Sequence, residues 1–193
     1  KHFVKFVDKL FNKYKLEAQK TGESENCTTI NQKKSSGKFS LLLHQKLVRD
    51  YLNTYTPYRG IFLYFGLGAG KTCSSIAIAE GLKTTNQVII MTPASLRSNY
   101  IKELKKCGDP LYKTNQYWEF ITTDNNIHVE TALSKVLSLP ISYIKENNGA
   151  WLVNKNKPSN YENISLENKK KLDDQLNLMI RSKYVFINYN GLR

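Results

Sequence analysis

The sequence has few cysteines and no long apolar run. Its 193 residues include only three cysteines, Cys27, Cys73 and Cys107, which are widely spaced and form no Cys-x-x-Cys pair. This number and spacing suit neither a disulfide framework nor a zinc site, so we expect a reducing compartment. No stretch approaches the roughly 20 apolar residues that cross a bilayer, and the mean hydropathy is -0.48. The sequence therefore argues against a membrane protein.

Acidic residues are also scarce. The chain has 29 basic and 16 acidic residues, which gives a formal net charge of +13. Such an excess points to polyanionic partners, above all DNA or RNA. Only 5 of the basic residues are arginine and asparagine is abundant, so the charge also suits a biased genome and a solvated lysine-rich surface. Composition alone leaves both interpretations open.

The first part of the chain predicts a helical extension. Apolar residues recur at three- and four-residue steps from Phe3 to Tyr14, which is typical of an amphipathic helix. This helix could dock on a partner or on the same chain, and docking on the same chain is the commoner outcome. Residues 21–38 contain almost no apolar side chains and predict a linker. We therefore assign residues 1–38 to an extension with a linker and residues 39–193 to the main domain.

The main domain begins with alternating helical and strand patterns. After a helical stripe over residues 41–52, the short apolar runs 61–65 and 88–91 predict strands that are buried on both faces of a parallel sheet. Helical patterns follow each run, over residues 71–80 and 95–106. This order predicts an α/β domain in which helices flank a parallel sheet.

The second half of the main domain is less regular. Residues 125–163 mix Asn, Lys and Glu with short apolar patches, and we expect an Asn/Lys-rich insertion with little regular structure beyond one helix near residues 130–139. A clearer helix follows Ser165, whose hydroxyl is suited to cap it. Residues 185–187 predict a third strand.

The segment between the first predicted strand and its helix reads Phe65-Gly66-Leu67-Gly68-Ala69-Gly70-Lys71-Thr72. Glycines let the backbone curl so that amide hydrogens point inward, and the following helix adds its dipole where a polyphosphate would sit. In such a phosphate loop, Lys71 reaches the β and γ phosphates and the Thr72 hydroxyl holds Mg²⁺. We therefore predict nucleotide binding by residues 66–72, with Lys71 and Thr72 as the catalytic residues. The plainer alternative is a glycine-rich turn that only joins strand to helix.

The loop departs from the usual pattern because its first position is Phe65 rather than glycine. In this respect it resembles superfamily 2 helicases and translocases, which often use x-x-x-G-x-G-K-T. Many of them carry an upstream glutamine that reads the adenine edge, and Leu43-His44-Gln45 resembles that element. An amide donates and accepts at once, so Gln45 would favour ATP. Otherwise Gln45 is a surface residue on an exposed helix.

A second segment, Met91-Thr92-Pro93-Ala94-Ser95-Leu96-Arg97, resembles motif Ia of the same superfamily. The resemblance implies that Thr92, Pro93, Ser95 and Arg97 touch a nucleic-acid backbone. Amides and hydroxyls at a helix N-terminus suit phosphate oxygens, which agrees with this role. The alternative is that Pro93 starts the helix, Ser95 helps to cap it and the basic residues are solvated.

These motifs, together with the closing Ile187-Asn188-Tyr189-Asn190-Gly191-Leu192, resemble the helicase-like ATPases of large DNA viruses of eukaryotes. The ATPase subunit of the poxvirus early transcription factor belongs to this group. The resemblance covers roughly residues 39–193 and implies an incomplete RecA-like domain that uses ATP and Mg²⁺. It further implies DNA or RNA and viral transcription proteins as partners, and a place in the virion or in the cytoplasm of the infected cell.

One expected part of this family is missing from the sequence. In the family an acidic motif II follows the closing segment, whereas here no Asp-Glu pair follows an apolar strand, and Asp173-Asp174 lies in a helical pattern. ATP hydrolysis in the superfamily needs those carboxylates and arginines from a second RecA-like domain. We therefore expect the N-terminal part of a nucleic-acid-dependent ATPase or helicase, inactive in hydrolysis by itself.

Two other interpretations stay open. The first is a non-catalytic nucleic-acid-binding or structural module with a helicase-like shape. The second is a small-molecule kinase with a phosphate loop, which would leave Gln45 and the segment Thr92-Pro93 without a role.

Overall fold

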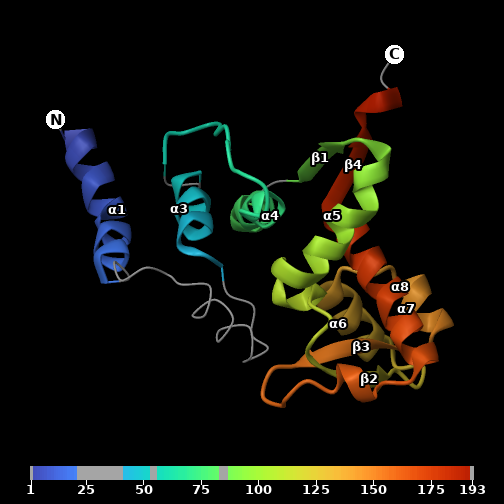
Figure 1. Cartoon of the computed structure of the whole chain (residues 1–193). Helices are drawn as coiled ribbons and strands as arrows, with labels where there is room; N and C mark the ends of the chain where they lie inside the picture. Colours follow the sequence, from blue (N-terminus) through green and yellow to red (C-terminus); the bar gives the residue numbers. More distant parts are fainter. Residues whose placement is uncertain (1, 21–40, 53–55, 83–86, 192–193) are drawn as a thin grey trace. The chain divides into compact units, whose positions relative to one another are not determined.

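We describe a computed structural model of the chain, which covers residues 2–20, 41–52, 56–82 and 87–191 (Figure 1). The chain divides into two compact units, Lys1–Leu82 and Lys83–Arg193, and each is described by itself. The predicted linker over residues 21–38 lies outside the described residues. Among the helices of the described residues, none has the length and apolar character needed to cross a membrane.

The described part of the N-terminal unit is helical. It consists of α1 (His2–Lys20), α3 (Leu43–Tyr51) and α4 (Lys71–Leu82). Both α1 and α4 pack against α3 (Figure 1). The sequence predicted α1 and α3 from apolar periodicity and α4 as the helix that follows the glycine-rich loop, and α1 docks on the same chain as expected.

One carboxylate of α3 takes part in the docking of α1. Asp50 accepts hydrogen bonds from Lys13 Nζ at 2.7 Å, from the Tyr14 hydroxyl and from Arg49 Nε at 2.8 Å. Burial by itself raises the pKa of Asp50, but these donors outweigh it and lower the pKa from 3.8 to about 2. The carboxylate therefore stays ionised and joins α1 to α3 above that pH.

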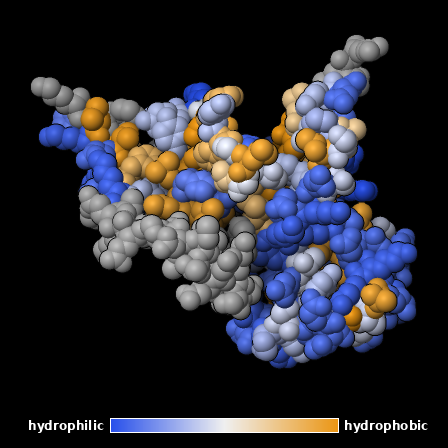
Figure 2. All heavy atoms as spheres, in the orientation of Figure 1, coloured by the Kyte–Doolittle hydropathy of each residue, from blue (hydrophilic) through white to orange (hydrophobic). Residues whose placement is uncertain are grey.

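Residues 61–65 do not form the buried strand that the sequence predicts. They have no strand structure, and the side chains of Phe62 and Tyr64 are 87% and 90% exposed. A parallel strand needs a neighbour for its backbone N–H and C=O groups, and the described part of the N-terminal unit contains no strand. The segment instead adds to the hydrophobic surface of this unit, which is orange in Figure 2.

The strands predicted near residues 88–91 and 185–187 form in the C-terminal unit and are parallel, but the prediction that the first is buried on both faces is wrong, because Ile89 and Met91 are more than half exposed. β1 (Val88–Thr92) pairs in parallel with β4 (Tyr184–Asn188), with Ile90 opposite Phe186. The two helices of this layer are α5 (Ala94–Cys107) and α8 (Leu166–Lys183), which pack against each other, and α8 also packs against β4. A parallel strand pair flanked by helices confirms the α/β class.

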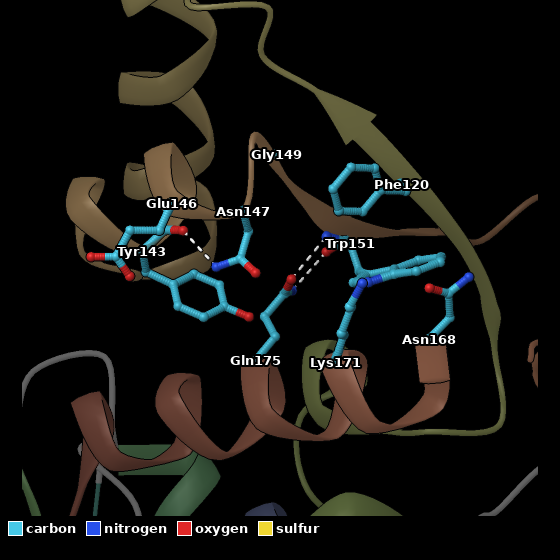
Figure 3. A pocket seen from close by; sticks show the side chains of 9 residues that line it. All are labelled: Phe120, Tyr143, Glu146, Asn147, Gly149, Trp151, Asn168, Lys171 and Gln175. Atoms are coloured by element: carbon cyan, nitrogen blue, oxygen red, sulfur yellow. Dashed lines mark hydrogen bonds between the residues drawn. The ribbon is translucent and has the colours of Figure 1, made fainter. Parts of the chain in front are cut away.

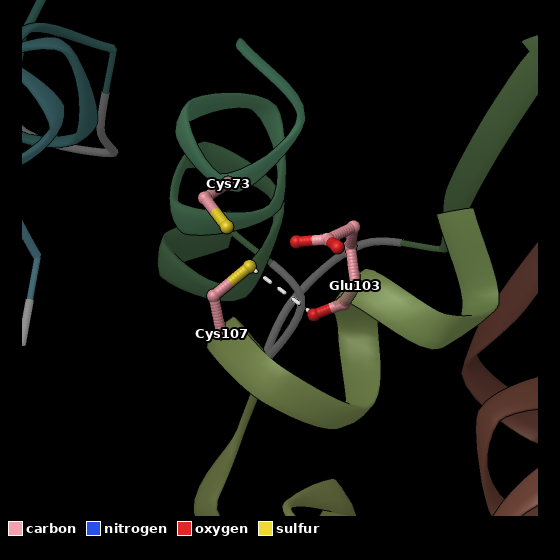
Figure 4. A group of neighbouring side chains, drawn as sticks. All are labelled: Cys73, Glu103 and Cys107. Carbon is pink, nitrogen blue, oxygen red and sulfur yellow. Dashed lines mark hydrogen bonds between the residues drawn. The ribbon is translucent and has the colours of Figure 1, made fainter. Parts of the chain in front are cut away.

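The ends of these two helices follow from local sequence signals. The Ser165 hydroxyl accepts a hydrogen bond from the Asn168 amide at the start of α8, which confirms the predicted cap. Near the end of α5, the Cys107 Sγ atom lies 3.2 Å from the backbone oxygen of Glu103, one turn earlier (Figure 4). The helix ends at Gly108, whose backbone is extended, and a side chain does not fit there because a Cβ would lie 2.5 Å from the Leu104 oxygen.

Residues 125–163 carry far more regular structure than the sequence predicts. α6 (Ile127–Leu137) and α7 (Ile141–Glu146) precede β3 (Gly149–Asn154), which pairs antiparallel with β2 (Tyr117–Thr122). Short 3-10 turns lie at Pro110–Tyr112, Tyr161–Asn163 and Tyr189–Gly191.

The scattered apolar residues of this region form a core. The side chains of Trp118, Leu133, Leu137, Ile144 and Ala150 are buried, together with Leu172, Leu176 and Met179 of α8. The prediction of an irregular insertion is therefore wrong, because apolar positions that look isolated in the sequence meet in space. Asn and Lys residues occupy exposed positions between them and obscure the pattern.

Candidate nucleotide-binding site

The glycine-rich loop joins the irregular segment 61–65 to α4. Gly68 and Gly70 both have φ of +77°, a conformation that glycine adopts without the strain of a side chain. The Ala69 amide donates to the Gly66 carbonyl at 3.4 Å, and the Ser74 amide donates to the Gly70 carbonyl at 2.9 Å, which begins the hydrogen bonding of α4. The loop is thus curled ahead of a helix N-terminus, as the sequence predicts.

Lys71 folds back over this loop. Its Nζ atom donates to the backbone oxygens of Phe65 and Gly66, both at 3.0 Å, and its side chain is exposed. These oxygens are neutral acceptors, so the anionic oxygens of a phosphate would compete well for the same ammonium group. Thr72 follows as the second residue of α4 and is half-buried.

The chemical groups of the site are compatible with ATP and Mg²⁺. A Cβ at Gly66 or Gly68 would meet nothing within 4 Å, so the outer side of the loop is open. The loop combines curled backbone, one ammonium group and one hydroxyl, and these suit phosphate oxygens and a hard cation.

Gln45 contacts the loop through its side-chain amide. The residue is 3% exposed; its Oε1 accepts from the Leu42 amide at 3.0 Å and its Nε2 donates to the Gly70 carbonyl at 3.3 Å. A Cβ on Gly70 would lie 2.3 Å from that Nε2 atom. The alternative of an exposed surface glutamine is therefore wrong, because Gln45 holds α3 against the loop.

His44 makes a second link to the loop that the sequence analysis missed. Its Nε2 atom lies 2.9 Å from the Ala69 carbonyl, and its ring meets Phe65 edge to face with 5.3 Å between ring centroids. Because a carbonyl oxygen only accepts, Nε2 must carry a hydrogen. The available signal was the position of His44 next to Gln45. We call this pair of residues the loop latch.

The residues predicted for nucleic-acid contact lie together in the C-terminal unit. Thr92 is the last residue of β1, Pro93 precedes α5, and no side chain caps that helix. Ser95 is exposed and accessible, and it does not cap α5, because Pro93 holds the N-cap position and no side-chain cap hydrogen bond is made. The Thr92 hydroxyl is buried and has no hydrogen-bond partner among the described residues.

Two basic residues of α5 also have structural contacts. The Arg97 guanidinium lies 5.2 Å from the centroid of the Phe186 ring on β4. Lys105 forms a 2.5 Å ion pair with Asp173, and only 11% of its side chain is exposed. Arg97 is therefore positioned by β4, whereas Lys105 joins α5 to α8.

Similar proteins are found among large DNA viruses, although no family profile and no solved structure matches the chain. The chain is 34% identical over 116 residues to the "Putative ATP-dependent RNA helicase R563" of Acanthamoeba polyphaga mimivirus, covering 60% of this chain. It is 36% identical over 86 residues, 41% of this chain, to the "Putative ATP-dependent RNA helicase L377" of the same virus. It is also 39% identical over 70 residues, 34% of this chain, to the "Putative helicase 009L" of Frog virus 3.

These matches cover a small part of each relative. The chain spans 19% of the length of the first protein and 7% of each of the other two. The predicted resemblance to helicases of large DNA viruses is confirmed at this level of similarity.

Proposed function

We propose that the chain is the nucleotide-binding front part of a superfamily 2 nucleic-acid-dependent ATPase of a large DNA virus. The observation that supports this most directly is the loop itself. It is curled at Gly68 and Gly70, has Lys71 folded over it, and is fixed to α3 by the loop latch. A turn that only joined two elements would not need two buried or half-buried side chains to hold its backbone.

In this proposal, Lys71 exchanges the carbonyls of Phe65 and Gly66 for phosphate oxygens, and Thr72 supplies a hydroxyl to Mg²⁺. Bound ATP with Mg²⁺ would supply the phosphoanhydride bond whose hydrolysis the full-length protein couples to work on nucleic acid. Gln45 is proposed to read adenine with the amide hydrogen and the oxygen lone pair that its bonds to Gly70 and Leu42 leave over, and because the residue is 3% exposed, this role requires that nucleotide binding uncovers the amide.

The C-terminal unit would provide nucleic-acid contact. Thr92, Pro93, Ser95 and Arg97 surround an uncapped helix N-terminus, which suits a phosphate group. DNA or RNA is the partner that the charge of +13 favours. We further propose a role in viral transcription, in the virion or the cytoplasm of the infected cell, and a likeness to the ATPase subunit of the poxvirus early transcription factor.

The proposed nucleotide role of the loop is tested by titrating the chain with a fluorescent ATP analogue. We expect Lys71→Ala to weaken binding at least about tenfold, because a charge-assisted hydrogen bond is lost. Lys155→Ala is the matched control, since it removes an exposed lysine of the C-terminal unit, and it should bind like the unaltered chain. Equal affinity of both variants would remove the loop from the proposed function.

A further inference from the structure

The C-terminal unit contains a pocket that the proposed ATPase function does not use. Its volume is about 450 Å³, and it lies between α7, the β2–β3 pair and α8 (Figure 3). Pockets of roughly 300–1,000 Å³ are the usual size for small-molecule and cofactor sites. All of its walls come from the unit Lys83–Arg193, so the pocket is complete without the nucleotide loop.

Two aromatic rings of the pocket are held by the β2–β3 pair. Phe120 and Trp151 are directly opposite each other across the strands, and their ring centroids are 5.3 Å apart at an angle of 67°. Gly149 has a φ of +150°, and a Cβ there would lie 2.9 Å from Phe120 Cζ. The absence of a side chain at Gly149 therefore leaves the space that the Phe120 ring occupies.

Gln175 fixes the aromatic wall to α8. It is fully buried, and its side chain accepts from the Trp151 amide and donates to the Trp151 carbonyl, both at 2.8 Å (Figure 3). A paired donor and acceptor of this kind sets the position of the Trp151 backbone. This wall of the pocket is therefore preformed in the absence of a ligand.

The pocket leaves apolar rings accessible beside polar groups. Phe120 is 41% exposed, Trp151 is half-buried, and Tyr143 provides a third ring from α7. Asn147 donates to the Tyr143 carbonyl at 2.8 Å, and its amide oxygen is an acceptor of the kind that pairs with base edges. Burial, followed by the charge of Asp174, raises the pKa of Tyr143, so its hydroxyl remains a neutral donor.

The charges at the pocket favour a base over a free phosphate group. Lys171 is the only lysine among the lining residues, and Glu146 also lines the pocket. Lys171 forms an exposed 2.7 Å ion pair with Glu167 on the same helix, which is weak enough to exchange for a backbone phosphate. One exchangeable lysine, Lys171, in a pocket that also contains the Glu146 carboxylate is not enough to form a phosphate-binding site.

We propose that this pocket takes one unstacked base from a single strand of nucleic acid. Aromatic rings stack on bases of any sequence, and amides and carboxylates pair with base edges. A base inside a duplex is stacked on both faces and must be unpaired and unstacked before it can enter, which favours a single strand. The inference rests on the proposed function in that it assumes a nucleic-acid partner, but its test needs neither ATP nor Lys71.

The test measures binding of a short, fluorescein-labelled RNA single strand to the full 193-residue chain without ATP. Phe120→Leu removes the ring but keeps an apolar side chain, and we expect about tenfold weaker binding. Tyr117→Leu is the matched control, because Tyr117 lies on the same strand at a position that alternation places on the opposite face. The control should bind like the unaltered chain.

Tryptophan fluorescence provides a second measurement that does not depend on a destabilising variant. Trp118 is 2% exposed, whereas Trp151 lines the pocket. The strand should therefore quench part of the emission of the chain, and this quenching should disappear in Trp151→Phe while binding persists.

The pocket proposal would be overturned if Phe120→Leu left the affinity for the strand unchanged, or if the matching duplex bound as tightly as the strand. It would also be overturned if a free nucleoside monophosphate quenched the tryptophan emission at the same concentration as the strand. Whatever the outcome for the pocket, Lys71→Ala should bind the strand without ATP as tightly as the unaltered chain does. A failure of the nucleotide loop is thereby distinguished from a failure of this pocket.

Discussion

At the scale of single residues, Gly70 is the position where the loop and the latch meet. Its φ of +77° is unfavourable for any side chain, and a Cβ would lie 2.3 Å from Gln45 Nε2. We expect Gly70→Ala to destabilise the chain by about 1–2 kcal/mol through backbone strain alone, and to weaken binding of an ATP analogue by displacing Gln45. Urea unfolding and nucleotide titration measure the two effects.

Gly60→Ala is the control for this substitution. Gly60 lies before the same loop, but a Cβ there meets nothing within 4 Å and its φ is not in the left-handed region. It should leave both stability and binding unchanged. Equal effects of the two substitutions would mean that glycine content, and not the contact between Gly70 and Gln45, determines the behaviour of the loop.

His44 gives a second residue-level prediction. Removing its hydrogen bond to the Ala69 carbonyl should free the loop and weaken nucleotide binding about fivefold, which corresponds to one hydrogen bond of about 1 kcal/mol. His44→Gln should recover part of the affinity, because a glutamine amide also donates. His128→Ala, an exposed histidine on α6, is the matched control. If His44→Ala binds as tightly as the unaltered chain, the latch has no role in binding.

At the scale of elements, the attachment of α1 to α3 should depend on pH. The folded pKa of Asp50 is about 2, below its ordinary 3.8, so the unfolded chain binds a proton first as the pH falls. The stabilisation is therefore nearly complete above about pH 5 and is lost as the pH falls toward about 2, and it amounts to about 2 kcal/mol.

Asp50→Asn isolates this effect. The variant should be less stable than the unaltered chain at neutral pH, and the difference in free energy of unfolding should close as the pH falls from about 5 to about 2. Urea unfolding at several pH values measures it. A difference that stays constant over this range would mean that the Asp50 carboxylate does not hold α1.

Local signals predicted the elements that depend on local contacts. Helices α5 and α8 follow from their helical patterns and, for α8, from the Ser165 cap, while α4 follows from its place after the glycine-rich loop. Residues 61–65 were predicted as a strand from their apolar run, but a strand also needs a neighbour, and sequence runs do not show which neighbour is present. The pocket was not predictable because Phe120, Trp151 and Gln175 are far apart in the chain.

The backbone of the glycine-rich loop follows the sequence closely, whereas its role in nucleotide binding stays a prediction. The spacing of glycines before Lys71 fixes a local backbone shape, which is why residues 66–72 were identified from sequence. The contact between Gln45 and Gly70 joins residues 25 positions apart. The nucleotide role of Gln45 was predicted only from the resemblance to helicases. No sequence pattern predicted the hydrogen bond between His44 and the Ala69 carbonyl.

At the scale of the whole molecule, the charge of +13 predicts strongly salt-dependent binding to nucleic acid. Lysine contacts to phosphates release counterions, so we expect affinity for single-stranded RNA to fall at least about tenfold between roughly 50 and 200 mM salt. Fluorescence anisotropy at several salt concentrations measures the slope. A flat dependence would indicate that the lysines only solvate the surface.

The most direct test of the nucleotide-binding proposal is a crystal structure of the chain with a non-hydrolysable ATP analogue and Mg²⁺. The proposal predicts phosphate density against residues 66–72, with the Lys71 ammonium moved from the carbonyls of Phe65 and Gly66 to the phosphates. A well-ordered chain whose loop is empty, with Lys71 still bonded to those carbonyls at saturating analogue, would contradict it.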